Sequence, residues 1–213
     1  MGPLPEHLNA AGFAIARPAL RGHGTHPQDL AKVRYTDWLE DAYEAFLTLP
    51  EPRGVVGLSM GGLLAAWVAA ELGAKALVAL APALGFKSPL APLAPYLWPL
   101  IPRYAGESSI HDPELRKKSP NYPWFPSRAF VELYKLAKKT PPVLRRVKAP
   151  ALVVEAEYDT VVPARAVRRY YDLLGCEEKE YRVLRGSGHD MLLDREAKTA
   201  ARWATAFFER HLL

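Results

Sequence analysis

The chain has 213 residues, and its 28 Lys and Arg against 23 Asp and Glu give a formal net charge of +5. Hydrophobic residues make up 49% and charged residues 24%, a balance that is typical of folded globular proteins and excludes a disordered chain. A single domain of this length buries roughly 70% of its unfolded surface, so we expect one domain over residues 1–213 that needs no structural metal.

In chain order, short apolar runs rich in β-favouring residues alternate with longer helical patterns. This alternation predicts an α/β fold with a mostly parallel sheet. The predicted strands are 12–17, 54–58, 76–80, 151–155 and 181–185. The predicted helices are 35–48, 62–72, 164–174 and 195–211.

Residues 81–150 differ from the rest in composition, being rich in Pro and in aromatic side chains, with a helical piece near 128–139. We interpret residues 84–149 as an insertion between two strands. Such an insertion can form a cap over a site, and the alternative is an irregular loop that packs its aromatic residues for stability. The sequence leaves both interpretations open.

The clearest local motif is the stretch from Gly57 to Gly61, which has the pattern G-x-S-x-G with Ser59 at its centre. An apolar strand precedes the motif and an apolar helix follows it. A nucleophile on a sharp strand-to-helix turn needs small residues two positions before and after it, because neighbouring backbone crowds those positions. The motif therefore predicts a nucleophilic serine at Ser59, and the alternative is a glycine-rich turn with an incidental serine.

A serine hydroxyl needs a base, and the base needs a third group to orient it. Of the six histidines, His189 lies between glycine and polar residues directly after a predicted strand, which favours it as the base. His23 and His26 are its rivals, although a role in stabilising a turn fits them better. The remaining histidines lie in polar or terminal settings.

Asp159 directly follows the strand predicted at 151–155 and is the favoured carboxylate, ahead of Glu155 and Glu157. The alternative for Asp159 is a helix cap. The order Ser59, Asp159, His189 is the nucleophile, acid and base order of α/β-hydrolases. Because each residue follows a different parallel strand, all three are expected at one edge of the sheet.

These pieces together resemble α/β-hydrolases of the bacterial carboxylesterase, monoacylglycerol-lipase and serine-aminopeptidase type. The matching stretches are 20–24, Trp38, 57–62, Asp159 with 162–163, 187–189 and 193–194. The resemblance implies that Ser59 attacks an ester carbonyl, that His189 is base and then acid, and that Asp159 orients His189. It further implies that the backbone N–H of Met60 belongs to an oxyanion hole and that the aromatic insertion supplies an acyl pocket.

The resemblance is incomplete at the N-terminal end. Such hydrolases carry, before the part that resembles 4–13, a strand that ends in a His-Gly loop and donates the second oxyanion N–H. The sequence starts at Met1, after that point. We therefore expect the first strands to be missing, a gap between 12–17 and 54–58, and a natural protein that begins earlier.

The leading function is a serine esterase that acts on short or medium acyl esters, including monoacylglycerols. The alternatives are an amide or peptide hydrolase of the same fold, and an inactive shortened hydrolase-like protein that binds a ligand or partner. No cofactor or metal is expected, since no ligand spacing or phosphate-binding loop is present. The single cysteine, Cys176, excludes a disulfide framework and fits a cytoplasmic protein. Scattered basic pairs and interrupted apolar runs predict neither nucleic-acid binding nor membrane insertion.

Overall fold

The computed structural model describes residues 2–106, 108–118 and 122–213. Its central sheet has four parallel strands in the order β1-β2-β5-β6. The strands are β1 (Gly54–Leu58), β2 (Ala76–Leu80), β5 (Ala151–Ala156) and β6 (Lys179–Leu184). The predicted parallel α/β architecture is therefore confirmed, and four of the five predicted strands form within three residues of their expected bounds.

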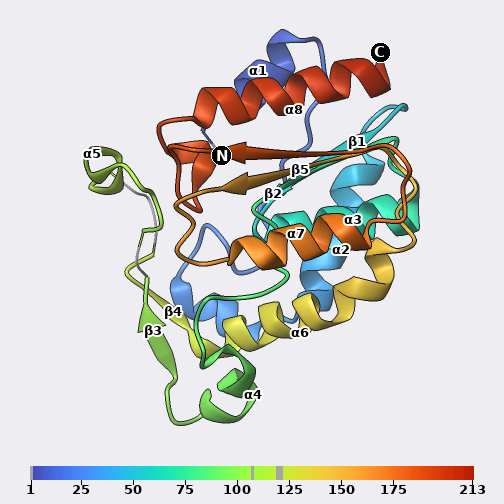
Figure 1. Ribbon diagram of the computed structural model, residues 1–213. Coiled ribbons are helices and arrows are strands. Elements are labelled where there is room, and N and C mark those ends of the chain that lie inside the picture. The colour runs from blue at the N-terminus through green and yellow to red at the C-terminus, as the bar shows by residue number, and fades with distance from the viewer. Residues whose placement is uncertain (1, 107, 119–121) are drawn as a thin grey trace.

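Helices cover both faces of the sheet (Figure 1). On one face lie α1 (Leu4–Ala10) and α8 (Ala197–Leu212), and on the other lie α2 (Tyr35–Leu47), α3 (Met60–Leu72), α6 (Ser127–Leu144) and α7 (Ala164–Leu173). A hydrophobic core lies on each face of the sheet, and the side chains of β2 alternate between the two. Leu77 packs in the core on the α3 side, which we call the main core, and Val78 packs in the core on the α8 side. Burial on both faces explains why this strand is apolar throughout.

Residues 12–17, predicted as a strand, form no strand in the structure. The physical reason is that β1 is an edge strand, paired with β2 alone, so these residues have no neighbouring strand with which to share hydrogen bonds. An apolar groove of about 630 Å³ runs between them and β1. We call this cavity the β1 groove; residues of α1, α2 and the last turn of α8 also line it.

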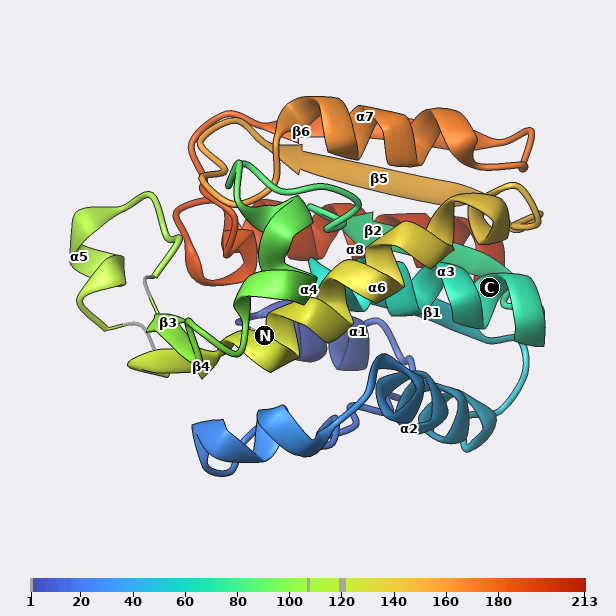
Figure 2. The same ribbon diagram turned by 90° about the horizontal axis from the view of Figure 1, so that it is seen from below.

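The stretch 84–149 divides into two parts. Its first part is irregular, with the short elements η2 (Ala91–Leu93), α4 (Ala94–Leu97) and α5 (Pro113–Arg116), and the hairpin of β3 (Arg103–Ala105) with β4 (Trp124–Pro126). Figure 2 shows α5 and this hairpin beyond the carboxyl ends of the parallel strands. Its second part is α6, whose Leu136 and Leu144 are completely buried in the main core.

Two further short helices, η1 (Pro27–Lys32) and η3 (Met191–Leu193), lie in connections. None of the helices in the described part of the chain combines the length and the apolar character that crossing a bilayer requires.

Candidate active site

Ser59 lies on a sharp turn between β1 and α3, where it occupies the N-cap position with φ 58° and ψ −116°. Positive φ is strained for a residue other than glycine and is held only where the surroundings enforce it. Gly57 is one such constraint, because a Cβ there would lie 2.0 Å from the Gly61 carbonyl oxygen. The expected crowding at Gly61 itself is wrong: a Cβ there would meet open space, since Gly61 faces the β1 groove.

The hydroxyl of Ser59 donates to Nε2 of His189 over 2.8 Å. His189 lies in the loop after β6 and is 5% exposed. The fold brings it to Ser59, from which 130 residues separate it in the chain. Its other ring nitrogen, Nδ1, donates to Oδ2 of Asp159 over 2.7 Å. A carboxylate accepts only, so this contact fixes the proton on Nδ1 and leaves Nε2 free to accept from the serine.

Asp159 lies in the loop after β5 and is 4% exposed. Its second oxygen, Oδ1, accepts from the backbone N–H groups of Val161 and Val162, each over 2.7 Å. These bonds hold the buried carboxylate in place and compensate its loss of water. The alternative role as a helix cap does not apply, because Pro163 is the N-cap residue of α7.

The rival residues lie elsewhere. His26 accepts from the backbone N–H of Gln28 and caps η1, which is the turn-stabilising role expected of it. His23 packs edge-on against Trp38, and burial lowers its pKa, which disfavours the charged form. Glu155 accepts a hydrogen bond from the Tyr181 hydroxyl, and Glu157 is exposed. The structure thus brings together the three residues that the sequence favours.

Met60 is the first residue of α3, so its backbone N–H has no acceptor inside the helix. It lies beside Ser59 at the positive end of the helix, where negative charge is stabilised. Ser59 and Met60 also line the β1 groove, together with His23. The groove lining contains no residue of 84–149, so this cavity is distinct from the acyl pocket expected of the insertion.

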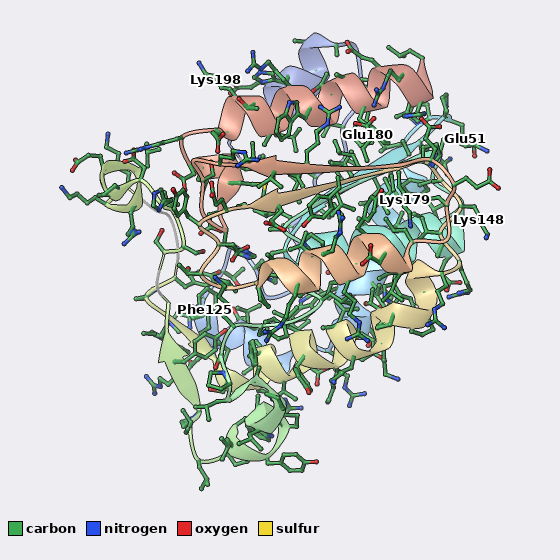
Figure 3. The ribbon with its side chains drawn as sticks, in the orientation of Figure 1. Glu51, Phe125, Lys148, Lys179, Glu180 and Lys198 are labelled. Atoms are coloured by element: carbon green, nitrogen blue, oxygen red, sulfur yellow. The ribbon has the colours of Figure 1, made fainter. Side chains whose placement is uncertain are left out.

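Several charged side chains lie at the opposite end of the sheet (Figure 3). Figure 3 labels Glu51, Lys148 and Lys179 at the amino ends of the strands, and Phe125 on the side of the carboxyl ends. Charged side chains at the amino ends are therefore remote from the triad, as the topology of an open parallel sheet predicts.

Within the described residues, no group of three or more His, Cys, Asp or Glu side chains is arranged to hold a metal ion. Cys176 is buried in the main core, away from the triad, and this burial raises the pKa of its thiol. A raised thiol pKa disfavours the nucleophilic thiolate. The acidic neighbour Glu178 also raises the pKa of Cys176, but Lys179 and Lys148 lower it, so the rise is due to burial and not, as the sequence suggested, to the acidic neighbours.

Three supporting residues escaped the sequence analysis. The buried Tyr170 hydroxyl donates to the Gly62 carbonyl in the first turn of α3, and Lys87 Nζ donates to the Asp159 carbonyl. Asp194 accepts hydrogen bonds from the His189 loop. No local pattern marks the first two, because their partners are 108 and 72 residues away. Asp194 lies in a stretch that matches the resemblance, but nothing in that match shows what it contacts.

Comparisons with known proteins agree with this geometry. A family described as serine aminopeptidase, S33 (Hydrolase_4) matches residues 2–196. A thermostable monoacylglycerol lipase from Bacillus sp. (strain H-257) is 28% identical over 99% of this chain and 85% of that protein. A carboxylesterase from Bacillus subtilis (strain 168) is 22% identical over 97% of this chain and 85% of its own length.

Solved structures give the same grouping. One reported for LipS and LipT, two metagenome-derived lipolytic enzymes, has a TM-score of 0.90 and 30% identity, and the match covers 98% of this chain and 86% of that chain. A monoacylglycerol lipase from Paleococcus ferrophilus has a TM-score of 0.80 at 22% identity and shares the fold, over 99% of this chain and 88% of its own.

Proposed function

Because the chain belongs to the serine aminopeptidase S33 family of α/β-hydrolases, we propose that it is a serine hydrolase that cleaves carboxylic esters. The observation that carries the proposal is the unbroken chain of hydrogen bonds from Ser59 through His189 to Asp159. The names of the relatives, a monoacylglycerol lipase and a carboxylesterase, support an ester substrate, monoacylglycerols included. A short or medium acyl chain is part of the proposal.

In the proposed reaction, the Ser59 oxygen attacks the ester carbonyl carbon while His189 Nε2 takes the hydroxyl proton. The resulting imidazolium is stabilised by Asp159 through Nδ1–H. The tetrahedral intermediate collapses, the bond to the alcohol oxygen breaks, and His189 returns the proton to that oxygen. A water molecule then repeats the sequence on the acyl-enzyme, which releases the carboxylic acid and restores Ser59.

The intermediate carries a negative oxygen that needs donors. We assign Met60 as one of them, supported by its place at the start of α3 beside Ser59. One donor of this kind lowers the barrier by roughly 2.7–4 kcal/mol.

The proposal further includes a cap formed by the irregular first part of the insertion 84–149, and a location in the cytoplasm. The cap is supported by the position of α5 and the β3–β4 hairpin beyond the carboxyl ends of the strands (Figure 1). The location is supported by the presence of one cysteine, Cys176, in the whole chain. The substrate is a small molecule.

An amide or peptide substrate is the second candidate, and the description of the matching family favours it. The triad itself does not choose between ester and amide. Rates on p-nitrophenyl butyrate and octanoate are therefore to be compared with rates on aminoacyl p-nitroanilides. We expect hydrolysis of the esters, and faster anilide cleavage would transfer the assignment to the peptidase.

The decisive test is labelling by a fluorophosphonate, which reacts with an activated serine. We expect folded protein to be labelled at Ser59, with no labelling of the Ser59→Ala variant. Ser108 and Ser109 provide internal controls, since peptide mapping should find both unmodified. Folded protein that is not labelled would identify the chain as an inactive hydrolase-like binding protein instead.

A further inference from the structure

Asp194 is a buried carboxylate, 3% exposed, at the end of η3. Its Oδ2 accepts from the backbone N–H of Gly188, directly before His189, over 2.8 Å, and from that of His111 over 2.5 Å. Its Oδ1 accepts from the N–H groups of Asp112 over 3.1 Å and Arg195 over 2.8 Å. One side chain therefore joins the catalytic histidine loop to a segment about 80 residues away in the chain.

We call residues 109–112 of that distant segment the strap. Ile110 anchors the strap with 1% exposure, and the Ser109 hydroxyl donates to Asp190 over 2.9 Å. The strap lies so close to Gly188 that a Cβ there would be 2.3 Å from the Ser109 carbonyl oxygen. The strap therefore contacts both neighbours of His189: its backbone approaches Gly188 closely, and the Ser109 hydroxyl bonds to the Asp190 side chain.

The strap also touches the loop that carries the acid of the triad. The His111 ring stacks on Tyr158, next to Asp159, with ring centres 3.9 Å apart and an angle of 7° between the planes. The Tyr158 N–H in turn donates to the Ser187 carbonyl, two residues before His189. The acid loop, the base loop and the strap thus form one hydrogen-bonded and stacked unit.

From these contacts, we propose that Asp194 is a positioning residue, which locks the strap against the His189 loop and so keeps His189 in line with Ser59 and Asp159. The inference rests on the proposed function, since alignment matters only if the triad reacts. Displacement of a reacting group by about 1 Å costs roughly 100-fold in rate.

Only an ionised carboxylate meets the demand at this position. Burial disfavours the charge, but the four backbone N–H donors outweigh it and lower the pKa of Asp194. An asparagine keeps the shape of the side chain but turns one oxygen into an NH₂ donor. That NH₂ would face two N–H donors, so either the pair at Gly188 and His111 or the pair at Asp112 and Arg195 loses its acceptor.

The test compares Asp194→Asn with a matched control, Asp112→Asn. Asp112 lies in the strap and caps α5, a role that asparagine fills about as well as aspartate. Its side chain also accepts a hydrogen bond from Arg195 near the end of the His189 loop, and the side-chain oxygen of asparagine can still accept that bond. Within the described residues, the Asp112 side chain makes no hydrogen bond to Gly188, His189 or Asp190. For each variant we measure the number of sites that react with fluorophosphonate and the rate constant of this labelling. We also measure kcat per reactive site and KM on p-nitrophenyl butyrate.

For Asp194→Asn, we expect the labelling rate and kcat per reactive site to fall about 10- to 100-fold, with KM changed less than about threefold. Asp112→Asn should stay within about twofold of the wild type. A merely structural role would lower the number of reactive sites and leave kcat per site unchanged. That result, or an Asp194→Asn protein with wild-type rates, overturns the proposal.

Ser109→Ala provides a milder variant should Asp194→Asn fail to fold. Since it removes one strap contact, we expect a two- to fivefold loss of kcat per site, and no loss would count against the strap. Amide hydrogen exchange at Gly188 and in the strap gives a readout that does not depend on activity. If the wild type is not labelled at all, the proposed function fails, and unchanged exchange in Asp194→Asn would then overturn this inference separately.

Discussion

The loops after β5 and β6 and the turn after β1 supply the three residues of the proposed triad, yet they lie in very different surroundings. Asp159 and His189 are almost fully buried, and backbone N–H groups or neighbouring carboxylates fix their loops at several points. Ser59 and Met60 are half-buried and border the open β1 groove. Asp159 and His189 are therefore enclosed by packed residues, whereas Ser59 and Met60 have packed residues on one side and the β1 groove on the other.

The strands beneath show the same contrast. β2 and β5 have neighbours on both edges, and their side chains are almost entirely buried. β1 is equally apolar, Gly-Val-Val-Gly-Leu, but it is an edge strand with most residues half-buried. Edge strands usually carry charges or irregularities that block further pairing, and β1 carries no charge. The composition of β1 therefore suits a strand with two neighbours, although the described chain provides one.

The largest expected effect tests the well-packed side. Asp159→Asn leaves the side-chain volume unchanged but destroys the acceptor that fixes the His189 tautomer, so we expect kcat to fall about 10⁴-fold. Steady-state hydrolysis of p-nitrophenyl butyrate measures it. Glu157→Gln is the control, because Glu157 is exposed on the same loop, and a comparable loss there would mean that the effect is not specific to Asp159.

The second prediction compares two glycines of the turn. Gly57→Ala should lower the free energy of unfolding by about 3 kcal/mol, because the new Cβ collides with the Gly61 carbonyl. Gly61→Ala should change it by less than about 1 kcal/mol, since its Cβ enters the open groove. Urea unfolding of both variants measures the two free energies. Equal destabilisation would show that Gly61, on the groove side of the turn, is as crowded as Gly57.

Hydrogen exchange compares the two strands directly. Amide protons of Val55–Leu58 should exchange at least about tenfold faster on average than those of Leu152–Val154, because β1 is paired along one edge and borders the groove. The measurement is native-state exchange read by mass spectrometry or NMR. Equal protection of the two strands would contradict the description of β1 as a free edge.

The smallest effect concerns the strain at Ser59. Ser59→Ala and Ser59→Gly both lose the proposed nucleophile, but only glycine adopts φ 58° without a steric penalty. We therefore expect Ser59→Gly to unfold with a free energy about 1 kcal/mol higher than Ser59→Ala. The two variants are each other's control, since both also lose the hydrogen bond to His189, and identical stabilities would argue against stored strain.

Much of this arrangement was predictable from the sequence, because the signals are local. The apolar run 54–58, the glycines of the motif and the apolar helix after it lie within about twenty residues, and they specify a strand, a turn and a helix by period and backbone freedom alone. The chain order of Ser59, Asp159 and His189, each after a strand, also gave the edge of the sheet at which they meet.

Other features depend on residues that are far apart in the chain, and only the tertiary structure decided them. Residues 12–17 have the composition of a strand but form none, because a strand needs a neighbouring strand for its hydrogen bonds. The β1 groove separates these residues from β1. Likewise, two of the four donors around Asp194, the N–H groups of His111 and Asp112, lie 83 and 82 residues away, so no local pattern encodes these contacts. The open space beside Gly61 depends on the β1 groove. The sequence by itself determined most of the elements and which side chains have the right chemistry, whereas packing decided whether a stretch such as 12–17 finds a neighbouring strand and which side chains find a partner.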